Sequence, residues 1–348
     1  MRAFRMREWL TDPVLTEVAT PEPGPGQVLV RVGGAGVCHS DLHIIREFRP
    51  GQLPWSLPFT LGHETAGWVE SVGDGVTGLE PGTPVAVYGP WGCGTCNQCL
   101  RGVETYCERP HEAPVRQGGA GLGLDGGMAD YLLVPHARHV VPLPEGLDPV
   151  TAAPLTDAGL TPYHAVRRSW PKLTPTALAV IIGIGGLGHL AVQIVKATTA
   201  ARVLAVDTRP EALETARRFG ADLTAPPGDG VAELVREETE GRGADVVIDC
   251  VGSDRTLTLA ASVGRVLGDL TIVGLGGGRL PVSFNSLPYE MSVQTTYWGS
   301  RSELVEVLSL ARRGLLHTEV TRFPLDDVAE AYRRLEEGTL TGRAVVTP

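Results

Sequence analysis

Residues 177–207 read ALAVIIGIGGLGHLAVQIVKATTAARVLAVD. An apolar run at 177–182 is followed by a glycine-rich turn, a longer segment to about residue 197, and a second apolar run at 202–206. Short apolar runs bounded by turns are typical of buried strands, and the longer segment is typical of a helix. Because a strand, a helix and a second strand follow in this order, the stretch predicts an α/β fold with a doubly wound parallel sheet.

The same alternation continues on the C-terminal side of this stretch, to about residue 293. It predicts a helix ending near Phe219 and Gly220, a helix at 231–238, and strands at Asp245–Cys250 and Asp269–Val273. Before about residue 154 the chain consists of short β segments between Pro and Gly turns, at 27–32, 68–72, 84–87 and 131–134. The C-terminal part adds helices at 301–313 and 325–337 and a β segment at 343–346. The chain therefore combines two kinds of architecture.

The glycine-rich turn predicts a dinucleotide site. It matches the pattern G-x-G-x-x-G with Gly183, Gly185, Gly186, Leu187 and Gly188. Such glycines let backbone amides approach a pyrophosphate at a helix N-terminus. Asp207, at the end of the next strand, would accept hydrogen bonds from the ribose hydroxyls and repel a 2′-phosphate, which favours NAD over NADP. The nearby Arg209 weakens that preference, and the alternative of a packing loop with an ordinary strand-end Asp is disfavoured in this context.

A cluster of cysteines predicts a structural metal site. Cys93, Cys96, Cys99 and Cys107 follow the spacing C-x2-C-x2-C-x7-C. Four thiolates fill every position of a tetrahedral zinc ion and leave none for a substrate. Four unrelated free cysteines are a poor alternative at this spacing. A nucleic-acid-binding zinc finger has a similar arrangement, but the chain shows no accompanying basic helix.

Composition excludes several classes of partner. The 348 residues include 30 Lys and Arg against 40 Asp and Glu, so a formal net charge of −10 argues against binding to nucleic acid. The first residues carry charges and no apolar signal core. Residues 177–195 lack a formal charge over a length that resembles a membrane span, but glycines divide them into two short pieces. We therefore expect a cytoplasmic protein with neither nucleic acid nor membrane as partner.

A second metal site is less evident from the residues themselves. The sequence has CHSDLH at 38–43 and GHE at 62–64. Cys38 and His63 would suit a catalytic zinc, which takes three protein ligands and leaves one position for water or substrate. A buried cysteine and an ordinary loop histidine explain the same residues equally well.

Taken together, the motifs show a resemblance to a known family. The pattern G-H-E-x2-G-x5-G-x2-V at 62–76, the cysteine cluster and the glycine turn occur in the order seen in zinc-dependent medium-chain alcohol dehydrogenases. The whole chain is similar to this family, and most similar to its bacterial NAD-dependent secondary-alcohol branch. The resemblance implies a GroES-like, mostly β catalytic domain at 1–157 and 294–348, with a Rossmann NAD-binding domain at 158–293 inserted between its two parts.

The resemblance also implies two Zn²⁺ ions per subunit, one catalytic and one structural. Cys38 and His63 match the first two catalytic ligands of the family. Asp157 matches the third, where the family usually has Cys and the secondary-alcohol branch has Asp. With these ligands the zinc site is formally neutral, so that a bound alcohol can ionise.

Further roles follow from the same resemblance. Ser40 matches the hydroxyl that hydrogen-bonds the substrate oxygen, and His43 the outer end of the proton relay. Ordinary polarity of a surface loop is the alternative for both. Asp41 matches the carboxylate that orients His63, and Glu64 the carboxylate behind the metal that is able to replace its water.

Cofactor and substrate contacts complete the implied site. His39 and Arg343 match residues that contact the pyrophosphate. Trp55, Tyr297 and Trp298 lie where the family lines its substrate pocket and dimer edge, and ordinary core or interface packing explains them equally well. Aromatic walls would suit an aryl- or alkyl-substituted substrate.

The resulting prediction is an oxidoreductase that transfers hydride between NAD and a zinc-bound secondary alcohol or ketone, as a homodimer or homotetramer. The alternatives within the family are dehydrogenases of polyols, amino-alcohols or primary alcohols. A zinc-free quinone reductase is disfavoured by Cys38, His63 and the cysteine cluster. A non-catalytic NAD-binding protein is the remaining alternative.

Overall fold

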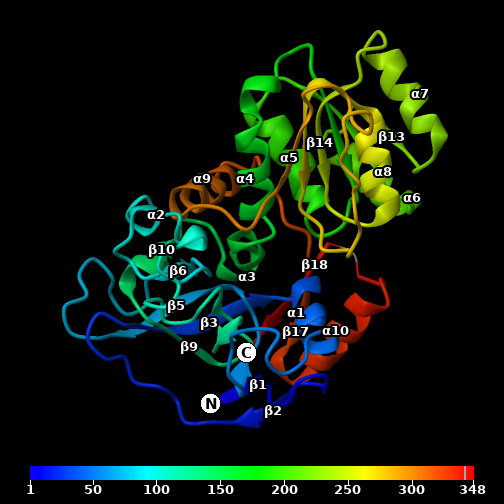
Figure 1. Ribbon diagram of the computed structural model, residues 1–348. Coiled ribbons are helices and arrows are strands. Elements are labelled where there is room, and N and C mark those ends of the chain that lie inside the picture. Colours follow the sequence, from blue (N-terminus) through cyan, green and yellow to red (C-terminus); the bar gives the residue numbers. More distant parts are fainter. Residues whose placement is uncertain (341) are drawn as a thin grey trace. The chain divides into compact units, whose positions relative to one another are not determined.

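The computed structural model describes residues 1–340 and 342–348. The chain forms two compact units (Figure 1). The β-rich unit comprises Met1–Asp157, Ser300–Arg312 and Thr318–Pro348, and the α/β unit comprises Ala158–Gly299 and Arg313–His317. The β-rich unit is therefore built from both ends of the chain.

The α/β unit contains a six-stranded parallel sheet in the order β13-β12-β11-β14-β15-β16. Its strands are β11 (Leu178–Ile182), β12 (Arg202–Val206), β13 (Leu223–Ala225), β14 (Ala244–Asp249), β15 (Gly264–Ile272) and β16 (Ser292–Thr295). Its helices are α4 (Leu160–Arg168), α5 (Gly188–Thr198), α6 (Pro210–Arg218), α7 (Asp229–Glu238), α8 (Asp254–Val263) and the short 3-10 helix η4 (Trp170–Lys172). Helices cover both faces of the sheet (Figure 1), so the predicted doubly wound fold is confirmed.

Successive side chains of β11 point to opposite faces of the sheet, and both faces are buried. Leu178, Val180 and Ile182 face one side, where they join a core cluster with residues of α7 and α8. In chain order the sheet grows outward from β11 to β13 and then returns to β14 on the other side of β11. The carboxyl end of β11 is therefore the switch point at which doubly wound sheets bind ligands. The glycine-rich turn lies there.

The strand predicted at Asp245–Cys250 ends one residue earlier, at Asp249. The Asp249 carboxylate accepts hydrogen bonds from the backbone N–H groups of Val251 and Gly252, at 2.8 and 3.0 Å. These bonds turn the chain out of the sheet, because an Asp side chain offers the following backbone an alternative to the strand ladder. Cys250 consequently lies beyond the strand, half-buried.

Three sheets make up most of the β-rich unit. The largest has the order β10-β6-β5-β3-β18-β17 with β9 also on β3; the others are β2-β1-β4 and β7-β8. The strands are β1 (Arg2–Met6), β2 (Val14–Glu17), β3 (Val28–Gly36), β4 (Phe59–Thr60), β5 (Glu64–Val72), β6 (Pro84–Val87), β7 (Gly119–Ala120), β8 (Gly123–Leu124), β9 (Tyr131–Val134), β10 (Val140–Pro142), β17 (Val320–Pro324) and β18 (Arg343–Thr347).

Short helices connect these strands. They are α1 (His39–Arg46), α2 (Asn97–Leu100), α3 (Pro149–Ala152), α9 (Arg301–Arg312) and α10 (Val328–Glu336), with the 3-10 helices η1 (Glu104–Tyr106), η2 (Ala137–His139), η3 (Ala153–Thr156) and η5 (Leu325–Asp327). The helix predicted at 325–337 thus begins with a 3-10 turn. Among the described residues, no helix has the length and apolarity to cross a membrane.

Candidate active site and cofactor site

The pairing of β3 with β5 brings the C-terminal end of β3 next to the N-terminal end of β5. In the register of β3 and β5, Gly36 lies opposite Glu64, so Cys38, just after β3, and His63, just before β5, are neighbours. The 3-10 helix η3 packs on both strands and places Asp157 at its C-terminal end. The ligand atoms of Cys38, His63, Glu64 and Asp157 all lie within 4.8 Å of one another. The structure therefore gathers the three implied zinc ligands and adds Glu64 to them.

The geometry of His63 fits a metal ligand. Its Nδ1 is 3.0 Å from Asp41 Oδ1, so that with the proton on Nδ1 the lone pair of Nε2 is available. Nε2 lies 3.4 Å from Asp157 Oδ2. Ligand bonds of about 2.0–2.1 Å place two donors of a tetrahedral zinc roughly 3.4 Å apart. A thiolate, an imidazole and a carboxylate at these positions fit Zn²⁺.

Asp41 and its partners are buried behind His63. Asp41 is fully buried, and its Oδ2 accepts hydrogen bonds from the Cys38 N–H at 3.2 Å and from the Tyr332 hydroxyl at 2.9 Å. Burial and the adjacent Asp41 carboxylate raise the pKa of Tyr332 well above its usual value, so the phenol stays protonated. Nothing in the sequence around Tyr332 marks it, because the contact arises only from packing of α10.

Glu64 occupies a space that only glycine leaves open. A Cβ on Gly36 would lie 1.9 Å from Glu64 Oε2, although the backbone of Gly36 is ordinary strand. Burial raises the pKa of Glu64 to about 7, against the opposing effect of Arg343. The Arg343 Nη2 is 2.5 Å from Glu64 Oε1, and Arg343 is itself 5% exposed. The structure thus places Arg343 against Glu64, and the pyrophosphate contact that the resemblance implies for Arg343 stays a prediction.

The residues implied for the proton relay share helix α1. Ser40 Oγ is 3.6 Å from the Cys38 sulfur, which puts it beside the metal ligands. His43 lies three positions further, on the same face of the helix, with Nδ1 2.7 Å from Glu47 Oε1. His39 is the first residue of α1 and is exposed.

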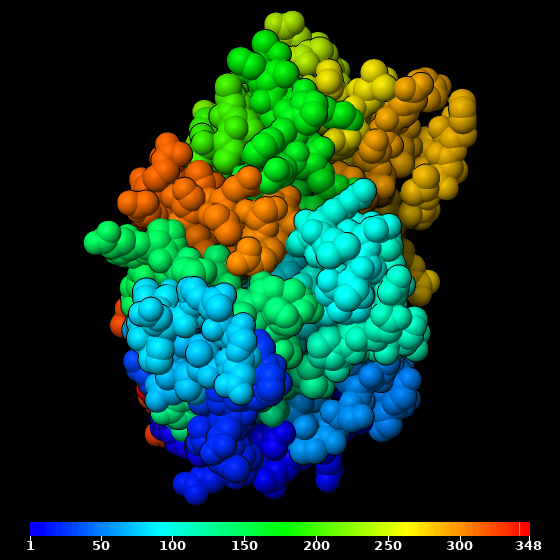
Figure 2. Space-filling model, turned by 90° about the vertical axis from the view of Figure 1, so that its left-hand side faces the viewer, coloured from blue at the N-terminus to red at the C-terminus, as the bar shows by residue number. Residues whose placement is uncertain are grey.

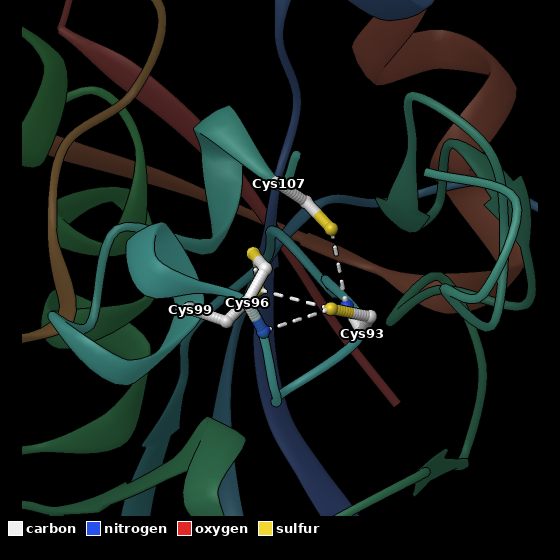
Figure 3. A group of neighbouring side chains, drawn as sticks. All are labelled: Cys93, Cys96, Cys99 and Cys107. Atoms are coloured by element: carbon white, nitrogen blue, oxygen red, sulfur yellow. Dashed lines mark hydrogen bonds between the residues drawn. The ribbon is translucent and has the colours of Figure 1, made fainter. Parts of the chain in front are cut away.

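Cys93, Cys96, Cys99 and Cys107 lie on one loop that carries α2 and η1, and their side chains turn towards one another (Figure 3). The Sγ atoms of Cys93 and Cys99 are 3.8 Å apart, and Zn–S bonds of about 2.3 Å give a tetrahedral edge of about 3.8 Å. Hydrogen bonds from Thr95 lower the pKa of Cys93 to about 6, which favours the thiolate. The donor set fits Zn²⁺.

Glu104, within the same loop, attaches it to the rest of the unit. This carboxylate is 6% exposed and contacts the Gly92 N–H at 2.7 Å, Arg138 Nε at 2.8 Å and His139 Nε2 at 2.9 Å. The sequence did not single out Glu104, because its partners are fixed by the fold. Figure 2 shows the loop, in cyan, at the surface of the molecule.

The glycine-rich turn has the geometry of an anion-binding loop. Gly183 has a φ of +86°, and a Cβ on Gly188 would lie 1.8 Å from the Gly183 carbonyl oxygen. A Cβ on Gly185 would meet nothing within 4 Å, so this side of the turn is open. Gly186 and Leu187 continue the turn into α5, whose N-terminus favours a pyrophosphate.

Asp207 is bound to this turn. Its Oδ2 accepts a hydrogen bond from the Ile184 N–H at 2.7 Å, and its Oδ1 one from the Arg209 N–H at 2.9 Å. Arg209 Nε is also 3.2 Å from Oδ1. A carboxylate and a guanidinium therefore lie side by side where the adenosine ribose is expected.

The three aromatic residues implied for the pocket differ in their environment. Trp55, in the β-rich unit, is partly buried and donates a hydrogen bond from Nε1 to the Arg116 carbonyl at 3.1 Å. In the α/β unit, Tyr297 is 48% exposed and Trp298 is 3% exposed. Trp298 therefore forms part of the core.

Two family models match the chain. The family model "Alcohol dehydrogenase GroES-like domain" matches residues 24–145, and "Zinc-binding dehydrogenase" matches residues 186–313. An NAD-dependent alcohol dehydrogenase of Sulfurisphaera tokodaii is 40% identical over 100% of both chains. The solved alcohol dehydrogenase of Aeropyrum pernix has a TM-score of 0.90 at 38% identity over 100% of both chains.

A solved acetophenone reductase from Geotrichum candidum, in complex with NAD, has a TM-score of 0.85 at 31% identity, over 100% of this chain and 97% of its own. Sequence identity at this level over whole chains shows that these proteins and this chain belong to one family, and do not merely share a fold. The chain belongs to the zinc-dependent medium-chain alcohol dehydrogenases, enzymes that transfer hydride between NAD and an alcohol or a ketone.

Proposed function

We propose that the protein interconverts secondary alcohols and ketones, including aryl- and alkyl-substituted ones. The observation that carries the proposal is the donor set of Cys38, His63 and Asp157, gathered beside the Ser40 hydroxyl. The similarity to an acetophenone reductase supports a ketone as the oxidised substrate. Trp55 would supply part of an aromatic wall for an aryl group.

Each residue of the site has a proposed task. Zinc held by Cys38, His63 and Asp157 would supply a Lewis acid that favours the alkoxide form of the alcohol. Ser40 accepts the hydrogen bond of the substrate hydroxyl, and His43 passes a proton on to solvent, because an imidazole can both accept and release a proton. Asp41 keeps His63 in the orientation that Zn²⁺ requires.

The α/β unit is proposed as the NAD-binding domain and the β-rich unit as the catalytic domain. In the former, the amides of the glycine turn would bind the pyrophosphate and Asp207 the ribose. His39 and Arg343 are proposed to add contacts with the pyrophosphate. Because the Arg343 guanidinium already binds Glu64, His39 is the more available of the two.

A substrate panel tests the proposal. NADH formation from NAD is measured with 1-phenylethanol, 2-propanol, ethanol and a polyol, before and after zinc chelation. We expect strong activity on the two secondary alcohols, lost on chelation. Activity on ethanol or the polyol alone would retain the zinc chemistry and refute the proposed substrate class. Activity that survives complete removal of zinc would refute the metal role.

Replacing Asp207 with glycine should relax the cofactor preference. The change removes the acceptor for the ribose hydroxyls and the charge that repels a 2′-phosphate, and it leaves Arg209 free to bind that phosphate. We expect the ratio of kcat/KM for NAD to that for NADP to fall about 10- to 100-fold, as loss of a charged hydrogen-bonding group predicts. Asp222→Gly, at an exposed ion pair with Lys196, is the control. Unchanged selectivity would assign the preference to other residues.

We propose that the protein is a homodimer or homotetramer. Strand β16 forms one edge of its sheet, and exposed apolar side chains gather in and before it, among them Phe284 at 81% and Tyr289 at 61% exposed. An apolar sheet edge favours pairing with another chain. Light scattering should therefore give a multiple of the 36.9 kDa subunit mass, and a monomer would contradict the proposal.

We also propose a cytoplasmic location. None of the six cysteines, all of which lie in the described part of the chain, forms a disulfide, and a reducing compartment would keep the cluster of four available for zinc. Recovery of the protein outside the cytoplasm on cell fractionation would contradict this location.

A further inference from the structure

A single carboxylate restrains two of the three proposed zinc ligands. Asp41 is fully buried; its Oδ1 contacts His63 Nδ1 at 3.0 Å and its Oδ2 accepts from the Cys38 N–H at 3.2 Å. The orientation of the Asp41 carboxylate therefore affects both the imidazole and the backbone that carries the thiolate.

One donor to Asp41 comes from outside the metal-binding segments. The Tyr332 hydroxyl donates to Asp41 Oδ2 at 2.9 Å across a sequence separation of 291 residues. Tyr332 is 5% exposed, and its ring is stacked on Phe4 with centroids 5.7 Å apart and planes at 19°. The ring is thus held by β1 while the hydroxyl holds Asp41.

We propose that Tyr332 is a positioning residue of the catalytic zinc site, acting through the hydrogen bond from its hydroxyl to Asp41. Without this bond, the one contact that Oδ2 keeps among the described residues is the longer one with the Cys38 N–H, and the buried carboxylate gains freedom to rotate away from His63. Loss of such a supporting contact typically lowers metal affinity about 10- to 100-fold. The inference rests on the proposed role of Cys38, His63 and Asp157 as zinc ligands.

Zinc affinity of the Tyr332→Phe variant tests the inference. The full-length protein is titrated with a chelator, and zinc release is followed separately from the catalytic site and from the Cys93–Cys107 cluster. We expect release from the catalytic site at about tenfold lower chelator concentration, and unchanged release from the cysteine cluster. Cobalt substituted at the catalytic site should show altered visible absorption bands, a readout independent of turnover.

A matched variant separates the hydroxyl from the ring. Phe4→Leu removes the stacked partner and leaves the hydrogen bond, so its catalytic-site zinc affinity should stay within about twofold of the parent. Equal losses in Phe4→Leu and Tyr332→Phe, or a loss from both zinc sites together, would indicate general loosening and overturn the inference. So would an unchanged affinity in Tyr332→Phe.

A double variant tests whether Tyr332 affects the zinc site through Asp41. The test remains valid even if the substitutions change the stability of the protein. If Tyr332 acts through Asp41, adding Tyr332→Phe to Asp41→Asn should lower zinc affinity no further, whereas independent effects would multiply. Multiplied effects would overturn the inference. A parent protein that binds one zinc, at the cysteine cluster alone, would instead refute the proposed function, so the two failures are distinguishable.

Discussion

Replacing Cys38 with serine should lower the rate of alcohol oxidation by about 10³-fold or more and leave NAD binding intact. The thiolate is a buried ligand at 7% exposure, and a serine hydroxyl neither ionises nor binds zinc comparably at neutral pH. Lewis-acid stabilisation is worth several kcal/mol, and each 1.36 kcal/mol corresponds to about tenfold in rate. The glycine turn and Asp207 lie in the other unit, so the cofactor site keeps its own contacts.

The measurement combines turnover of 1-phenylethanol, zinc content and NAD binding. Zinc content should fall from two ions to one per subunit, and NAD should still bind. Cys250→Ser is the matched control, because Cys250 is a half-buried cysteine outside both metal-binding groups. Full alcohol oxidation by Cys38→Ser would contradict the proposed mechanism and favour a different metal ligand set.

Features encoded by neighbouring residues could be predicted from the sequence. The run from residue 177 to 207 shows a strand, a turn, a helix and a second strand, and the structure has β11, α5 and β12 there. The cysteine cluster is similarly local, because all four ligands come from one loop. In both cases the interacting residues are close in sequence. A short length of backbone can arrange them in few ways, so the sequence pattern suffices to predict their contacts.

Contacts between distant segments could not be predicted in this way. Asp157 is one of 40 acidic residues, and only the family resemblance singled it out. Its approach to His63 depends on η3 packing against β3 and β5. The Tyr332 contact needs the placement of α10, and the burial of Arg343 against Glu64 needs the pairing of β18 with β3. These positions depend on how distant elements pack, which the local pattern of residues does not specify.

Removing one ligand of the structural zinc should produce the largest loss of stability. In Cys107→Ser we expect the melting temperature to fall by about 10 °C, the shift that a loss of several kcal/mol gives in a protein of this size. The loop around this site has only short helices, α2 and η1, and Leu100 on it is 72% exposed, so little apolar packing holds it. The metal must therefore supply much of its stability.

Calorimetry with zinc analysis checks this expectation, with Cys250→Ser again as the matched cysteine control. Below the lowered melting temperature the variant should keep the catalytic zinc and measurable alcohol oxidation, because none of the cysteines in the loop belongs to the group around His63. A variant that loses the zinc yet melts at the parent temperature would show that Glu104, through Gly92, Arg138 and His139, suffices to hold the loop. Loss of both zinc ions would show instead that the two sites are coupled.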